Sequence, residues 1–150
     1  MNTIHADNAP EPVGSYPHAK RAGNFLFLSG VGPRKRGSKE IPGVTVDARG
    51  AITSYNIEQQ CHSVFQNVRL ILEASGSAWE NLIDVTVFLT NMKQDFAVVN
   101  KIYSEYFKED QPCRTTVEVN ALPTPIAIEL KCIAIITQVP EPVEGTDNLN

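Results

Sequence analysis

The chain has 150 residues, of which 42% are hydrophobic and 20% charged, as is typical of one globular domain with a sizeable core. Its net charge of −4 argues against a broad nucleic-acid-binding surface. No apolar run reaches the roughly 18 residues that a membrane span needs, and the first residues lack the regions of a signal peptide, so we expect a cytoplasmic protein.

The first predicted strand covers residues 25–30, a short aromatic and aliphatic segment that ends at Gly30. The proline-rich residues 1–17 before it predict an irregular loop. After it, residues 31–53 contain Gly-Pro, Pro-Gly and Arg-Gly pairs, which are turn signals. We therefore expect a long connection there, with one short strand at residues 44–46.

Two helices are predicted on either side of a strand. The first begins after an N-cap at Ser54 and stops at Gly76, with apolar residues at helical spacing between them. Residues 82–90 alternate between two faces, which is typical of a strand. The second helix covers about residues 94–108, again with apolar residues along one side.

The last two predicted strands, residues 114–120 and 126–138, surround a proline-bearing turn and are expected to form a hairpin. Together the elements predict an α+β fold, in which both helices cover one face of a mixed sheet of five or six strands. The last strand is largely apolar on both faces, which predicts a homo-oligomer that covers the second face. We expect one domain at residues 1–139 and a frayed acidic tail at residues 140–150.

Two charged residues near this turn are the strongest candidates for chemistry. Arg114 opens one strand with Thr116 on the same side, where a guanidinium can take a carboxylate ligand through two hydrogen bonds, or else it closes an ordinary surface ion pair. Glu129 lies inside the apolar last strand, where an acid is costly unless it is paired or used. One interpretation is a buried salt bridge to Lys131 or Arg114, and the other is a carboxylate that moves protons.

Other polar residues leave alternatives open. Tyr16 lies in a proline-flanked loop, either as a lid over a pocket or as a packing residue. Asn100 lies within a helix, where asparagine is a mediocre helix former, and either binds a loop or ligand or faces solvent. The basic cluster at residues 34–39 is either a solvated loop or a surface that attracts a dianionic substrate.

The cysteines and histidines indicate neither a disulfide framework nor a metal site. Cys61, Cys113 and Cys132 are odd in number and widely spaced, and none of the histidine spacings suits a metal. Cys61 and Cys132 fall on apolar faces, so we interpret them as core residues. Motifs for nucleotide binding and for a serine nucleophile are absent from the sequence. The sequence therefore gives little support for metal, serine-nucleophile or nucleotide-cofactor chemistry.

From about Ala9 to Ile136 the chain resembles the reactive-intermediate (enamine/imine) deaminases, the RidA or YjgF-type family. The segment from Arg114 to Glu129 carries the most specific part of this resemblance. Within the family, the chain is most similar to the 2-aminomuconate deaminases, because of Gln111–Thr116 and the enlarged loop at residues 33–50. The other matching segments are Gly14–Tyr16, Phe27–Gly30, Asn67–Val68, Asp84–Phe88 and Phe96–Tyr103.

The resemblance implies a chorismate-mutase-like fold and a homotrimeric barrel with active sites between subunits. It also implies hydrolysis of a 2-imino acid without a cofactor. Arg114 matches the residue that holds the substrate carboxylate, and Glu129 matches the residue that activates water. The remaining matches are to substrate-binding positions: Tyr16, Gly30, Asn100 and Thr116. Thr116 stands where many members of the family have cysteine.

The function expected from this resemblance is hydrolytic deamination of 2-aminomuconate to 4-oxalocrotonate and ammonia, in the catabolism of aromatic compounds. One alternative is a general deaminase of 2-imino acids and enamines. Another is a trimeric ligand-binding protein without catalysis. A dicarboxylate substrate also needs a second cation, for which the sequence offers four candidates without choosing among them: Arg34, Arg36, Lys39 and Lys131.

Overall fold

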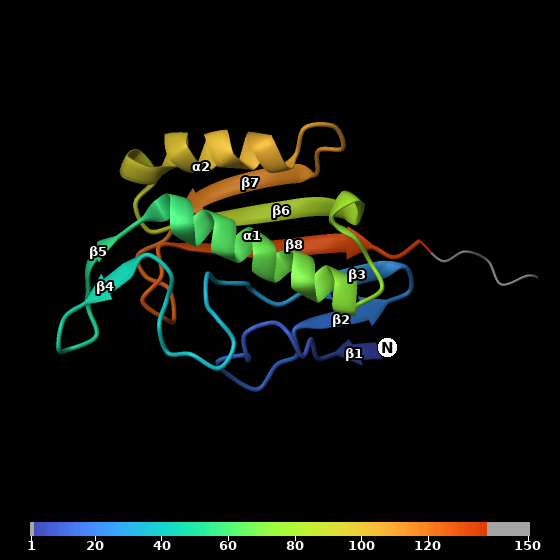
Figure 1. Ribbon diagram of the computed structural model, residues 1–150. Coiled ribbons are helices and arrows are strands. Elements are labelled where there is room, and N and C mark those ends of the chain that lie inside the picture. The colour runs from blue at the N-terminus through green and yellow to red at the C-terminus, as the bar shows by residue number, and fades with distance from the viewer. Residues whose placement is uncertain (1, 138–150) are drawn as a thin grey trace, which may run out of the picture.

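The computed structural model describes residues 2–137, which form a six-stranded sheet with two long helices. The strands lie in the order β1-β2-β3-β8-β6-β7, and only β6 and β7 are parallel neighbours (Figure 1). Strand β6 therefore lies in the middle of the half of the sheet that carries the candidate residues. The strands are β1 (Asn2–Ile4), β2 (Ala19–Ala22), β3 (Phe25–Leu28), β6 (Leu82–Leu89), β7 (Cys113–Glu118) and β8 (Ile128–Ile135).

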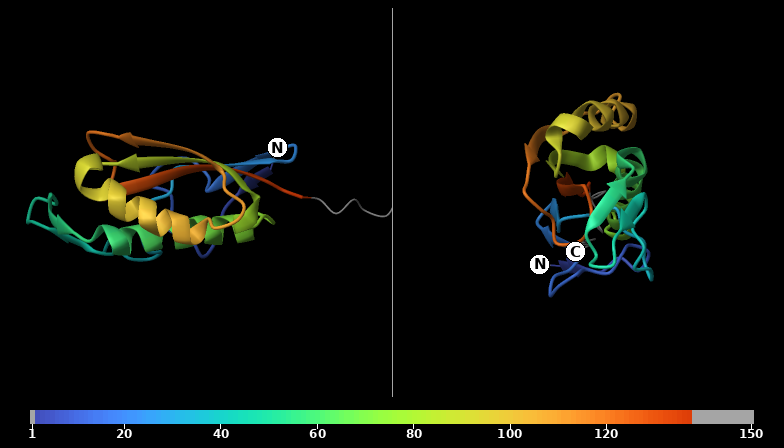
Figure 2. Two further views of the ribbon diagram at one scale, coloured as in Figure 1. Left: turned by 90° about the horizontal axis from the view of Figure 1, so that it is seen from above. Right: turned by 90° about the vertical axis from the view of Figure 1, so that its left-hand side faces the viewer.

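Both helices cover the same face of this sheet, which confirms the predicted α+β class (Figure 2). Helix α1 (Ile57–Ala74) and helix α2 (Met92–Tyr106) are each capped by an asparagine side chain, Asn56 and Asn91, that accepts a backbone N–H of the first turn. After α1, Gly76 adopts φ +74°, the left-handed conformation that ends a helix. Neither helix is long and apolar enough to cross a bilayer, nor is any other in the described residues.

The core lies between the helices and the sheet. Its largest fully buried side chain is Phe65 of α1, which is 1% exposed, and Leu26 of β3 and Leu130 of β8 pack into the same cluster. Cys61 and Cys132 are fully buried in it, as predicted, and burial raises the pKa of each thiol to about 12. Both therefore stay protonated at neutral pH and act as small apolar residues.

The sheet face opposite the helices, which we call the open face, carries exposed apolar side chains beside polar ones such as Glu129 and Lys131. Phe25 and Phe27 of β3 are 49% and 40% exposed, and Val117 of β7 is 36% exposed. Register places Ile133 and Ile135 of β8 beside the two phenylalanines, on the same face. Exposed apolar side chains grouped on one sheet face are the feature expected of a surface for association.

The predicted hairpin of the last two strands is wrong. Strands β7 and β8 are not neighbours, because β6 lies between them, parallel to β7 and antiparallel to β8. The strands are also shorter than the predicted 114–120 and 126–138. Residues 119–127 therefore pass across the end of β6, and the amide of Val119 still bonds to Leu89 there.

Three short strands were not predicted. Strand β1 lies within residues 1–17, which we expected to be a loop, and β2 follows that segment. The long connection contains β4 (Val44–Val46), as predicted, and also β5 (Ile52–Tyr55), and these two form a separate two-stranded sheet. The first helix begins after Asn56 rather than Ser54, and the second spans Met92–Tyr106 rather than 94–108. The expected tail at residues 140–150 lies outside the described residues.

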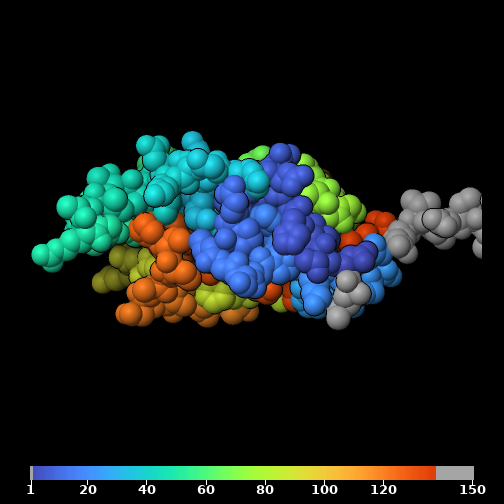
Figure 3. Space-filling model, turned by 90° about the horizontal axis from the view of Figure 1, so that it is seen from below, coloured from blue at the N-terminus to red at the C-terminus, as the bar shows by residue number. Residues whose placement is uncertain are grey.

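The β4–β5 hairpin extends from one end of the molecule (Figure 3) and is tied to α2 by a part-buried hydrogen bond. The hydroxyl of Tyr55 donates to Oδ2 of Asp95 at 2.6 Å, and Asp95 is 1% exposed. Burial raises the pKa of the Asp95 carboxyl, and the bond from Tyr55 offsets part of this rise. The pKa of Asp95 is higher in the folded protein than in the unfolded chain. Protonation of Asp95 therefore contributes fully to stability at a pH below the unfolded pKa, and this contribution is lost as pH rises through the folded pKa.

We expect Tyr55→Phe to lower the free energy of unfolding by about 1–3 kcal/mol at neutral pH, because a buried carboxylate then lacks its donor. Urea denaturation measures this loss. In an Asp95→Asn background the same change should cost clearly less, since no buried charge depends on the hydroxyl. An equal cost in both backgrounds would contradict this account of the contact.

Candidate functional site

Arg114 lies at the start of the edge strand β7, against helix α2. Its Nη1 donates to Oδ1 of Asn100 at 2.8 Å, and its guanidinium carbon lies 4.7 Å from the ring centre of Tyr103 and 6.0 Å from that of Phe96. The amide and the aromatic rings hold the guanidinium in place, while its other donors remain available for a ligand. We call Arg114, Asn100, Tyr103 and Phe96 the arginine cluster.

Glu129 is the second residue of β8, on the open face, and it is half-buried. Gly30 packs directly on it, because a Cβ atom at this glycine would lie 3.0 Å from Cδ of Glu129. Gly30 in turn lines a pocket together with Tyr16 and Arg34. We call Glu129, Gly30, Tyr16 and Arg34 the glutamate cluster.

The protein environment of Glu129 stabilises the protonated, neutral form of its carboxyl relative to the same carboxyl in water. Burial raises the pKa of its carboxyl, and the charge of Arg34 offsets part of the rise. The carboxylate makes no ion pair with any residue of the described chain. Lys131 instead donates to the backbone oxygen of Leu28, and Arg114 bonds to Asn100, so the salt-bridge interpretation of Glu129 does not hold for residues 2–137.

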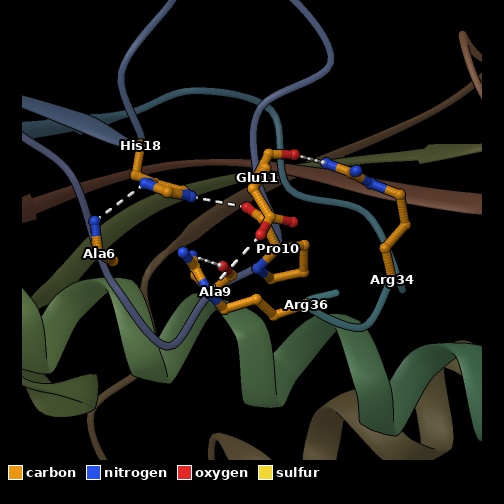
Figure 4. A network of polar contacts seen from close by, with 7 residues as sticks. All are labelled: Ala6, Ala9, Pro10, Glu11, His18, Arg34 and Arg36. Atoms are coloured by element: carbon orange, nitrogen blue, oxygen red, sulfur yellow. Dashed lines mark hydrogen bonds and ion pairs between the residues drawn. The ribbon is translucent and has the colours of Figure 1, made fainter. Parts of the chain in front are cut away.

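The loop that carries Tyr16 is held by a network around His18 (Figure 4). Nδ1 of His18 accepts the backbone N–H of Ala6 at 2.9 Å, and Nε2 lies 2.6 Å from the backbone oxygen of Pro10. These bonds describe the neutral ring with its proton on Nε2. Arg34 and Arg36 reach the same loop, donating at 2.9 Å to the backbone oxygens of Glu11 and Ala9. The segments before β2 and after β3 are thereby locked together.

Helix α1 fixes the second of these segments from the other side. Nδ2 of Asn67, a residue only 6% exposed, donates to the backbone oxygens of Gly32 at 2.9 Å and Arg34 at 2.7 Å. A buried amide whose two N–H groups both donate to one loop fixes the path of that loop. Arg34 therefore leaves the core from a defined backbone position.

One chain does not bring Arg114 and Glu129 together. Arg114 pairs with Val85 of β6, and Val85 is only 1% exposed because its side chain faces the helices. Glu129 instead pairs with Phe88, on the open face. Since side chains alternate along β6 and paired residues share a face, the two candidates lie on opposite faces of the sheet. The arginine cluster and the glutamate cluster are thus two separate halves.

The six predicted site residues divide between these halves. Asn100 contacts Arg114, and Thr116 follows on the same side of β7. Tyr16, 39% exposed, shares a pocket with Gly30 beside Glu129. Sequence reasoning did not find the aromatic neighbours of Arg114, since helix and strand meet only in the fold. Among residues 2–137 no group of three or more His, Cys, Asp or Glu side chains gathers in a way that would hold a metal ion.

Comparison with known proteins gives the family. Residues 6–136 match the family model described as Endoribonuclease L-PSP, which is most of the chain. The chain belongs to this family. A RutC family protein of Pyrococcus horikoshii is 42% identical to this chain over 132 residues. These residues cover 87% of this chain and 94% of the relative.

Two further proteins are similar to the chain, one in sequence and one in structure. The protein named Reactive Intermediate Deaminase A, chloroplastic, of Arabidopsis thaliana is 35% identical over 133 residues, which are 89% of this chain and 65% of that protein. The crystal structure of E. coli TdcF with bound serine has a TM-score of 0.78 at 28% identity, covering 91% of this chain and all of the other. The predicted resemblance to the RidA-type family and its fold is confirmed.

Proposed function

We propose that this L-PSP family member catalyses hydrolytic deamination of 2-aminomuconate to 4-oxalocrotonate and ammonia. The observation that carries the proposal is Glu129, a half-buried carboxylate with a raised pKa and no ion-pair partner in residues 2–137. A relative named as a reactive-intermediate deaminase supports the reaction class. The dicarboxylate substrate and its place in aromatic catabolism rest on the resemblance of residues 111–116 and of the enlarged loop.

The proposed enzyme is a homotrimer in which two neighbouring subunits complete each site. Arg114 and Glu129 lie on opposite faces of one sheet, so a single site that uses both needs the arginine cluster of one copy and the glutamate cluster of another. The exposed apolar side chains of the open face, Phe25 and Phe27 among them, support association of such copies. Sheets packed through their open faces would make the central barrel.

In this mechanism Arg114 binds the carboxylate next to the reacting carbon. Its guanidinium is already oriented by Asn100 and Tyr103, so little freedom is lost when the substrate binds. Thr116 lies on the same side of β7 and offers a hydroxyl to the same ligand. The carbon beside this carboxylate then faces water at a fixed distance.

Glu129 transfers the protons. The enamine first tautomerises to an imine, whose carbon is the electrophile. Water adds to the C=N bond as Glu129 accepts one of its protons and passes it to the imine nitrogen, which gives a neutral carbinolamine. Glu129 then accepts the proton of the carbinolamine hydroxyl and delivers it to the nitrogen, as the carbonyl forms, the C–N bond breaks and ammonia leaves. Gly30 packs against this carboxylate, and Tyr16 lines a pocket together with Gly30.

The pH dependence tests the role of Glu129 directly. If its base form is required, kcat/KM should fall at a pH above the ordinary glutamate pKa of about 4.3, because burial raises this pKa. Arg34→Met should move the acid limb to still higher pH, since the Arg34 charge lowers the pKa of Glu129. Measurement with a monocarboxylate imine from about pH 4 to about pH 9 covers the range.

Arg36→Met is the matched control for this profile, since Arg36 pairs with Glu11 at 3.6 Å and does not act on Glu129. Its acid limb should coincide with that of the unaltered protein. A limb that stays in place in Arg34→Met, or moves equally in both variants, would contradict the assignment.

The decisive experiment for the function is steady-state ammonia release from freshly generated 2-aminomuconate, compared with 2-iminopropanoate. Turnover of both at similar efficiency would favour the general 2-imino-acid deaminase. Binding of carboxylates with no ammonia from any enamine would favour the non-catalytic ligand-binding protein. The family description also names an endoribonuclease, but a net charge of −4 gives no broad footprint for RNA.

A further inference from the structure

A linear dicarboxylate has an anionic group at each end, and Arg114 accounts for only one of them. Four cations were candidates for the other, and the structure separates them. Arg36 is occupied by Glu11 and by the backbone of Ala9. Lys131 donates to the backbone of Leu28. Lys39 lines a different pocket, beside the β4–β5 hairpin.

Arg34 is the remaining cation, and its position suits the role. It lines the pocket shared by Tyr16 and Gly30, and its charge acts on the pKa of Glu129. It makes no ion pair with any described residue. Through one nitrogen, Nη2, it donates to the backbone oxygen of Glu11, and no described residue accepts from Nε or Nη1. The side chain is therefore anchored at one corner and keeps donors for an anion.

The backbone beneath Arg34 is fixed as well. Asn67 binds the backbone oxygen of Arg34 itself, and Pro33 before it is buried. An arginine held at its backbone and at one terminal nitrogen loses little entropy when it takes a carboxylate. The same holds for Arg114 in the arginine cluster, so each half of the proposed site contains one pre-oriented guanidinium.

We propose that Arg34 is the second carboxylate subsite, which selects linear unsaturated dicarboxylates over monocarboxylates. This inference rests on the proposed function for the location of the first carboxylate at Arg114. A substrate with carboxylates at both ends then spans the two halves. Its reacting carbon lies next to Arg114 and Glu129, and its far end lies at Arg34. A monocarboxylate leaves Arg34 without a ligand.

Binding of two unreactive probes tests the subsite without catalysis. Muconate and sorbate have the same six-carbon diene, and sorbate carries a methyl group where muconate carries its second carboxylate. By calorimetry, muconate should bind roughly ten- to a hundredfold more tightly than sorbate, the range of a charge-assisted contact. Arg34→Met should abolish this preference, and Arg34→Lys should retain part of it. A preference that persists in Arg34→Met, or is absent from the unaltered protein, would overturn the proposal.

Arg36→Met is again the matched control, because it removes the same charge and a similar backbone bond from the same loop. It should keep the preference for muconate, whereas general electrostatic attraction would weaken equally in both variants. Thermal denaturation of the variants checks that the loop remains folded.

Ammonia release separates failure of this inference from failure of the proposed function. A protein that deaminates imines but binds muconate and sorbate equally would overturn the Arg34 subsite and leave the function intact. A muconate preference that depends on Arg34, without ammonia from any imine, would uphold the subsite and overturn the function.

Discussion

Glu129→Gln should reduce kcat by roughly 10²–10⁴-fold while substrate still binds, because a glutamine amide neither accepts nor returns the proton. The amide has nearly the same shape as the carboxylate, so the close contact with Gly30 is preserved. Burial penalises the charged carboxylate, so the folded protein should become no less stable. The rate of ammonia release at saturating substrate gives kcat, and calorimetry gives the dissociation constant of muconate.

Glu73→Gln is the control for this substitution, since Glu73 is exposed on α1, and its kcat should equal that of the unaltered protein. Normal turnover by Glu129→Gln would refute the role of Glu129 as the proton carrier. A large loss of muconate binding in Glu129→Gln would show instead that the residue acts in binding.

Mixing two inactive variants should restore activity if each site combines two copies of the chain. Arg114→Ala lacks the guanidinium that would bind the substrate carboxylate, and Glu129→Gln lacks the base. Each variant alone should therefore be nearly inactive. When the two are co-expressed in equal amounts, each half of a site comes from either variant with equal chance, and about a quarter of the sites should be intact. The measurement is the ammonia-release rate per chain, relative to the unaltered protein.

A second mixture provides the control. The unaltered chain mixed equally with the double variant Arg114→Ala/Glu129→Gln should also give about a quarter of full activity for composite sites. If both residues acted within one chain, that mixture would give about half, and the two single variants would restore nothing. This second pattern would rule out the intersubunit site.

The sequence was sufficient for the two candidate residues because each breaks a local pattern. Glu129 interrupts an apolar strand and Arg114 begins a polar one, and both irregularities are visible without neighbours. Their separation on opposite faces was not visible, because it depends on which residue of β6 pairs with each. A proline-bearing turn predicts a hairpin from local information, while the insertion of β6 between β7 and β8 is a long-range choice.

The short strands were missed for a similar reason. β1, β2 and β5 contain three or four residues each, too few for a hydrophobic period to emerge. They are strands because of their partners, such as the pairing of Lys20 with Phe27 of β3. The helices, by contrast, were found with their approximate ends, since an 18-residue helix repeats its apolar face several times.

The position of β7 at the edge of the sheet gives the two halves of the site unequal local stability. Glu129 lies on a strand bonded on both sides, to β3 and β6, so opening it disrupts the centre of the sheet. Arg114 lies on a strand bonded only to β6, which opens at lower cost. Glu129, the proposed proton carrier, thus lies on the more stable part of the sheet. Arg114, the proposed carboxylate-binding residue, lies on an edge strand whose fluctuations a bound substrate or a second copy would suppress.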